Sequence, residues 1–70
     1  MNTIYYRYLI YDVIEWDFSD GTKPDLIGRA NDKATIKQII RGWEAETDGE
    51  CNIWIWDKER NDWVELEIIK

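Results

Sequence analysis

The chain has 70 residues, of which 44% are hydrophobic and 34% charged, and this composition favours one small folded domain over residues 1–70. A formal net charge of −6 repels phosphates and anionic lipids, so we expect no direct nucleic-acid partner and no membrane partner. Histidine is absent and Cys51 is the single cysteine, which leaves no disulfide and none of the usual metal sites to stabilise the domain.

The sequence carries no sign of export. Met1 to Ile4 lack the basic stretch and apolar run of a signal peptide, and no apolar run in the chain reaches the length that spans a bilayer. A lone cysteine is typical of a reducing compartment. We therefore predict a cytoplasmic protein.

Residues 3–18 form a run of aromatic and β-branched residues, which favours a β-strand. Apolar side chains occupy both alternating sets in the middle of the run, as in a central strand. The even-numbered set is the more apolar and is predicted to face inward: Ile4, Tyr6, Tyr8, Ile10, Ile14, Trp16 and Phe18. Asp12 interrupts this set, which we interpret as the site of a β-bulge.

A turn and a short edge strand are predicted next. Residues 19–22 contain Asp20-Gly21, a pair that readily supplies the backbone angles of a tight turn. Pro24 then restricts the segment that follows to a sheet edge or to the start of a strand. We therefore interpret residues 25–30 as an edge strand beside the first.

A helix is predicted from Asn31 or Asp32, because either residue can cap its first turn. Its apolar residues have the spacing of one buried stripe: Ile36, Ile39, Ile40 and Trp43. A basic ridge beside the stripe, which we interpret as a solvated flank, consists of Lys33, Lys37 and Arg41. The acidic segment 44–50 ends the helix and opposes its macrodipole, a placement that favours either solubility or a partner. Asp48-Gly49 forms the turn into the last two strands.

The end of the chain predicts a β-hairpin around a loop at 58–61. In this register Asp57 faces Asp62, and the remaining pairs are Trp56–Trp63, Ile55–Val64, Trp54–Glu65, Ile53–Leu66 and Cys51–Ile68. One face of the hairpin is then entirely apolar: Cys51, Ile53, Ile55, Val64, Leu66 and Ile68. The other face carries Trp54, Trp56 and Trp63 beside Asn52, Glu65 and Glu67.

The order strand, strand, helix, strand, strand predicts an α+β fold, in which one helix packs on one face of a four-stranded antiparallel sheet. The helix stripe would cover the apolar face of the hairpin and the inward set of the first strand. The tryptophan face would have no helix over it.

No pattern predicts catalysis, a metal or a cofactor. The four glycines are isolated and form no phosphate-binding loop. No histidine is present to activate a nucleophile, and Cys51 falls on the core face as a structural thiol. Glu65 and Glu67 beside Trp54 resemble the carboxylates of a sugar site, but so small a sheet offers no deep cleft. We expect a non-enzymatic protein.

The tryptophan face predicts protein binding, because exposed aromatic patches mark interaction sites. The candidate contact residues are Trp54, Trp56, Trp63, Glu65 and Glu67. The leading hypothesis is an acidic module that docks on a basic surface of a larger protein. In size and charge the chain is similar to the small inhibitors that phages carry against host nucleases, such as anti-CRISPR and antirestriction proteins. Two alternatives stay open: a homodimeric structural or accessory protein that uses this face as its own interface, and a small-ligand or carbohydrate binder.

Overall fold

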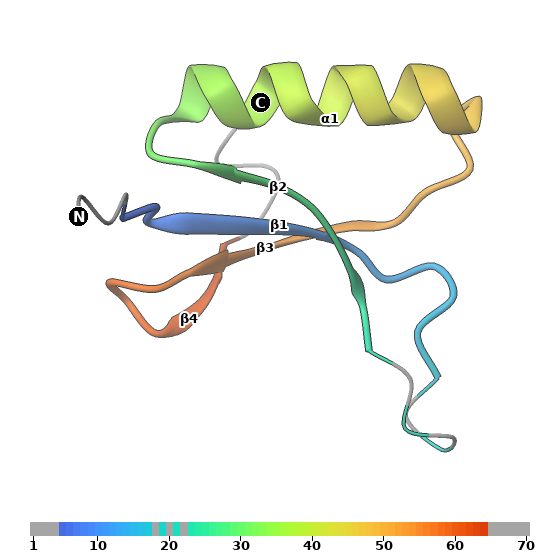
Figure 1. The fold of residues 1–70 in the computed structure, drawn as a ribbon, viewed down its shortest axis with the longest axis horizontal. Helices are drawn as coiled ribbons and strands as arrows, with labels where there is room; N and C mark the ends of the chain where they lie inside the picture. Colours follow the sequence, from blue (N-terminus) through green and yellow to red (C-terminus); the bar gives the residue numbers. More distant parts are fainter. Residues whose placement is uncertain (1–4, 18, 20, 22, 65–70) are drawn as a thin grey trace, which may run out of the picture.

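The computed structural model describes residues 5–17, 19, 21 and 23–64. In chain order these residues form β1 (Tyr8–Asp12), β2 (Asp25–Ala30), α1 (Lys33–Thr47), β3 (Ile53–Asp57) and β4 (Asp62–Val64). The strands build one antiparallel sheet in the order β2-β1-β3-β4, and α1 lies along one side of it (Figure 1). The predicted α+β fold, with one helix and a four-stranded antiparallel sheet, is confirmed.

β1 is a central strand, as predicted, but it is shorter than the run 3–18. The chain turns directly after β1, where Asp12 Oδ1 accepts a hydrogen bond from the amide of Ile14 at 3.0 Å. The amide of Trp16 then donates to the carbonyl oxygen of Val13 at 3.0 Å, which closes a β-turn. Of the predicted run, residues 3, 4 and 18 lie outside the described residues.

This turn also corrects the predicted inward set. Ile10 and Asp12 are buried as expected, but Ile14 is 54% exposed. Trp16 contacts Trp54 on the other face of the sheet, with 6.4 Å between their ring centroids. Alternation with a period of two holds only while the backbone stays extended, and here it stops at Asp12.

The predicted bulge exists, but it lies in β2 and not at Asp12. Ile10 pairs with Gly28 whereas Tyr11 pairs with Leu26, so Ile27 is the extra residue. Asp12 remains in phase and pairs with Asp25 and with Ile53. The segment 25–30 is confirmed as an edge strand.

The ends of α1 follow the predicted signals. Asp32 is the N-cap, and its carboxylate accepts a hydrogen bond from the amide of Thr35 at 2.7 Å. After Thr47, Asp48 adopts the left-handed conformation with φ 55°, and the amide of Gly49 donates to the carbonyl oxygen of Glu44 at 2.9 Å. The turn at Asp48-Gly49 is therefore confirmed.

The hydrophobic core lies between α1 and one face of the sheet. Its buried residues are Ile10, Ala30, Ile36, Ile53 and Ile55, and seven residues pack around them: Tyr8, Ile27, Ile39, Ile40, Trp43, Cys51 and Val64. The helix stripe and the apolar face of the hairpin thus meet as predicted. Leu66 and Ile68 lie outside the described residues.

The hairpin register is confirmed where it is described. Asp57 pairs with Asp62, Trp56 with Trp63 and Ile55 with Val64. The three further predicted pairs involve Glu65, Leu66 and Ile68 and lie outside the described residues. On its other side, β3 pairs with β1, which sets Trp56 beside Leu9 and Trp54 beside Tyr11.

Candidate protein-binding site

The open face is the side of the sheet opposite α1, and the described part of the chain places no helix over it (Figure 1). Ile10, Ile53 and Ile55 point into the core under α1. Because neighbours on a strand point to opposite sides, the residues between them face the other way. The open face therefore carries Leu9 and Tyr11 from β1, Trp54 and Trp56 from β3, and Trp63 from β4.

Five rings form a connected group on this face, which we name the aromatic cluster: Tyr11, Trp16, Trp54, Trp56 and Trp63. Trp63 is its centre, with ring centroids 5.0 Å from Trp56, 5.2 Å from Trp54 and 6.1 Å from Tyr11. All these pairs are edge-to-face, the geometry that aromatic quadrupoles favour. The rings therefore support one another over the sheet face that points away from α1.

The aromatic cluster remains partly accessible. Trp54 is 40% exposed and Trp63 is 36% exposed, while the other three members are half-buried. The structure thus brings together the predicted contact residues Trp54, Trp56 and Trp63. Glu65 and Glu67, the other predicted contact residues, lie outside the described residues.

Sequence reasoning did not assign Trp16 to the open face, because the turn after β1 contains neither glycine nor proline, the residues that usually mark a turn. The available signal was Asp12, since an aspartate side chain can accept the amide two residues on and start a turn. Tyr11 of β1 joins the aromatic cluster through its contact with Trp63. Tyr5 instead lies under Lys58, whose Nζ is 4.6 Å from its ring centroid.

An open groove of about 400 Å³ crosses this face. Leu9, Pro24 and every member of the aromatic cluster except Trp54 line it, together with Lys23 and Lys58. Its volume is within the range of roughly 300–1,000 Å³ found for small-ligand sites, and its walls are mainly apolar, as in such sites. The groove can therefore accept an apolar side chain with charged groups near its lysines.

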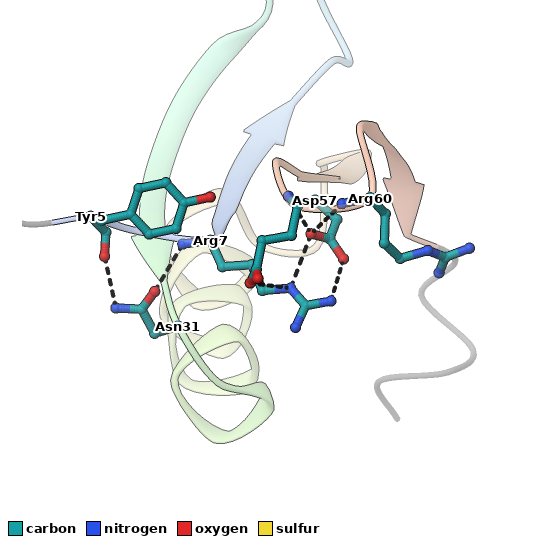
Figure 2. A network of polar contacts seen from close by, with 6 residues as sticks. Tyr5, Arg7, Asn31, Asp57 and Arg60 are labelled. Carbon is teal, nitrogen blue, oxygen red and sulfur yellow. Dashed lines mark hydrogen bonds and ion pairs between the residues drawn. The ribbon is translucent and has the colours of Figure 1, made fainter.

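An ion pair between the half-buried Arg7 and the buried Asp57 fixes the turn of the hairpin (Figure 2). Asp57 is 1% exposed, and the Arg7 guanidinium donates to both its oxygens, at 3.0 Å from Nε and 2.9 Å from Nη2. The amides of Glu59 and Arg60 also donate to Asp57. The bond from Arg7 and these amides outweigh burial and lower the pKa of Asp57. The network holds the turn that sets Trp56 opposite Trp63.

The same network ties the segment before β1 to the start of α1. Asn31 Oδ1 accepts a hydrogen bond from the amide of Arg7 at 2.8 Å, and Asn31 Nδ2 donates to the carbonyl oxygen of Tyr5 at 3.1 Å (Figure 2). Arg7 Nε also lies 3.1 Å from a carboxylate oxygen of Glu59. Arg7 thereby joins the entry of β1 to the hairpin turn, 50 residues further along the chain.

Asp12 is a second buried carboxylate, at the opposite end of β1. Its Oδ2 accepts a hydrogen bond from Trp43 Nε1 at 2.7 Å, and its Oδ1 accepts one from the amide of Asn52 at 3.1 Å. Burial raises the pKa of Asp12, but these bonds and that of the Ile14 amide outweigh burial and leave the pKa below its ordinary value. Asp12 thus joins β1, α1 and the entry to β3, two residues before Trp54.

The charged residues of α1 lie at positions where they destabilise the helix. The basic ridge Lys33, Lys37 and Arg41 occupies its first part, and the first turn holds no acidic residue. The acidic end, which we define as Glu44, Glu46, Asp48 and Glu50, follows, and the last turn holds no basic residue. Both groups are exposed, and their interaction with the helix macrodipole is unfavourable, because basic residues lie toward its positive end and acidic residues toward its negative end. The two ends of α1 therefore differ strongly in charge.

Among the described residues, no group of three or more histidine, cysteine, aspartate or glutamate side chains is placed to hold a metal ion. In the same part of the chain, no helix combines the length and apolar character needed to cross a membrane. Comparisons of the chain with protein-family models, with curated proteins and with solved structures found no match.

Proposed function

We propose that the protein is a small non-enzymatic binding module that docks through its open face on a basic surface of a larger protein. The exposed aromatic cluster carries this proposal, because Trp54 and Trp63 keep more than a third of their surface accessible. Contiguous exposed aromatic surface marks interaction sites, and tryptophan is among the residues that dominate their affinity.

The charge of the chain supports a basic partner. A net charge of −6 attracts basic proteins over a distance and speeds their encounter. The acidic end of α1 has its charges where they cost helix stability. Selection for partner binding would account for that placement.

Blocking a surface is the simplest activity for such a module. A compact acidic protein that covers a basic surface excludes nucleic acid from it, because nucleic-acid affinity depends on lysine and arginine contacts with phosphates. This proposal extends the similarity in size and charge to the small phage inhibitors of host nucleases.

Capture of partners from a native lysate tests the proposal. We expect the immobilised protein to retain a basic protein that salt releases, and the double variant Trp54→Ala/Trp63→Ala to lose it. Gln38→Ala is the control, because Gln38 is exposed on α1, on the other side of the sheet. A partner that all three proteins capture equally would exclude the open face as the binding site.

The same exposed rings support a homodimer as the second candidate, because an accessible aromatic face on a domain of this size also suits self-association. Sedimentation at increasing concentration separates the two. A dimer that Trp54→Ala dissociates would assign the face to a second copy. A monomer at every concentration would leave it free for another protein.

A further inference from the structure

The groove on the open face adjoins a second, more polar pocket, where β1 ends and β2 begins (Figure 1). This pocket has a volume of about 190 Å³ and is lined by Asp12, Glu15, Trp16, Lys23 and Asp25. Trp16 and Lys23 also line the groove, so the two hollows have two residues in common. Because Trp16 belongs to the aromatic cluster, the pocket lies directly beside the proposed binding surface.

The pocket carries an excess of negative charge. Its lining contains three carboxylates and one ammonium group. Two of the carboxylates, those of Asp12 and Asp25, belong to residues that are directly opposite each other in the pairing of β1 with β2. Like charges at opposite positions of a strand pair repel each other and destabilise the sheet. A further cation in the pocket would therefore relieve a repulsion that the fold itself creates.

Two of the three carboxylates have capacity for such a cation. Asp12 is buried, and both of its oxygens accept hydrogen bonds from within the fold. Glu15 and Asp25 are exposed, and neither forms an ion pair with a basic residue in the described part of the chain. The pocket thus offers two charged acceptors next to the indole ring of Trp16.

An arginine side chain matches this combination. Its planar guanidinium group stacks on aromatic rings and presents five donors to carboxylates, whereas the ammonium group of lysine is a compact point charge. Bonds between guanidinium donors and carboxylates are also among the stronger hydrogen bonds in proteins. The pocket has room for the four heavy atoms of a guanidinium group, since one water molecule takes about 30 Å³ in the liquid.

We propose that this pocket binds an arginine side chain of the basic partner, with the guanidinium group against Trp16 and bonded to the carboxylates of Glu15 and Asp25. This inference rests on the proposed function and names the side chain that the partner contributes beside the aromatic cluster. The net charge of the chain attracts a basic surface at long range, and the pocket selects one residue of that surface at contact distance.

NMR titration of the isotope-labelled protein tests the choice of arginine. The probe is a capped peptide of glycine, arginine and glycine. One matched peptide has lysine in place of arginine, and another has citrulline, which keeps the shape of arginine without its charge. We expect the arginine peptide to shift the indole signal of Trp16 until the pocket is saturated. The lysine peptide should bind about threefold more weakly, and the citrulline peptide should give no saturable shift.

Charge removal identifies the contacts. Glu15→Gln and Asp25→Asn should each weaken binding of the arginine peptide by about threefold, because each removes an attraction. Lys23→Gln should instead strengthen it by about twofold, because it removes a repulsion. Glu59→Gln is the control, since Glu59 lies in the hairpin turn beyond Asp57, which pairs with the opposite end of β1. Salt screens a charge at that distance, so the affinity should stay nearly unchanged. Unchanged dispersion of the indole signals shows that each variant is folded.

Three results would overturn the inference. The lysine or citrulline peptide could bind as tightly as the arginine peptide, Glu15→Gln and Asp25→Asn could act no more strongly than Glu59→Gln, or Lys23→Gln could weaken binding. The proposed function is tested separately by lysate capture. If capture still depends on Trp54 and Trp63 when the peptide results fail, the open face remains the binding site and only its arginine contact is excluded.

Discussion

At Gly28 the backbone of β2 comes so close to α1 that a side chain has no room. An added Cβ would lie 2.9 Å from both Cδ1 and Cγ2 of Ile39. The extra residue of the bulge is next to this contact, at Ile27. A single glycine within a strand often marks such a bulge or a close approach, and here it marks both.

We expect Gly28→Ala to destabilise the domain by about 1–3 kcal/mol, because Ile39 must leave its packed position. Gly42→Ala is the matched change on α1, the helix that carries Ile39, and nothing lies within 4 Å of its Cβ position. That variant should gain roughly 1 kcal/mol from helix propensity. Denaturant unfolding measures both, and equal effects of the same sign would contradict the tight contact at Gly28.

Neighbouring residues of β3 should respond in opposite ways. Ile53 is 6% exposed in the core, so Ile53→Asp buries an unpaired charge and should unfold the domain. Trp54→Ala removes a side chain from the open face and should cost about 1–3 kcal/mol through its lost aromatic contacts and buried apolar area. Circular dichroism and denaturant unfolding check both, and a loss of fold in Trp54→Ala would show that the aromatic cluster is core.

At the scale of elements, local sequence signals were sufficient to predict α1 and the hairpin. Asp32, the Ile36–Trp43 stripe and Asp48-Gly49 fix the helix within the sequence, and the loop length fixes the hairpin register. The end of β1 was not predicted because a side chain, Asp12, makes the turn. The pairing of Arg7 with Asp57 was also missed, since it joins residues 50 positions apart and no local pattern reveals it. Because this ion pair was not predicted, the sequence did not show where the hairpin turn lies against β1.

The hairpin turn should make stability depend on acidity. The folded-state pKa of Asp57 is lowered, so its contribution is complete above the unfolded-state pKa of about 3.9 and is lost as the pH falls below it. Asp12 contributes with the same sign. We expect Asp57→Asn to be less stable than the wild type at neutral pH and to lose less stability on acidification. Unfolding curves from about pH 6 to pH 2 measure this, with Gln38→Ala as control, and an unchanged pH slope in Asp57→Asn would contradict the ion pair.

At the scale of the whole molecule, the proposed binding surface and the hydrophobic core are separated by position. The core and its helix lie on one side of the sheet and the aromatic cluster lies on the other, so we expect changes on the open face to leave the core intact. The sequence contained enough to assign Trp54, Trp56 and Trp63 to this face. It did not reveal the groove, because Trp16, Lys23 and Lys58 reach the groove from loops whose course no periodicity records.

Charge removal from α1 should change stability and association independently. Glu44→Gln/Glu46→Gln relieves repulsion at the helix C-terminus and should stabilise α1 by about 0.3–1 kcal/mol. The same variant should associate more slowly with the captured basic partner, because its attraction at long range is weaker. Lys33→Gln/Lys37→Gln is the control: it should also stabilise α1 but associate faster. Thermal unfolding and surface-binding kinetics measure the two effects, and equal association rates would exclude steering by α1.

The edge-to-face indoles have an optical consequence. Trp54, Trp56 and Trp63 are close enough for their electronic transitions to couple, at centroid distances of 5.0–5.2 Å. Coupled chromophores held at fixed angles give a circular-dichroism signal that depends on their mutual orientation. A molecule that settles on the open face and tilts one ring would alter that signal directly. The candidate site thus contains its own spectroscopic reporter, and occupancy can be followed without attaching a dye.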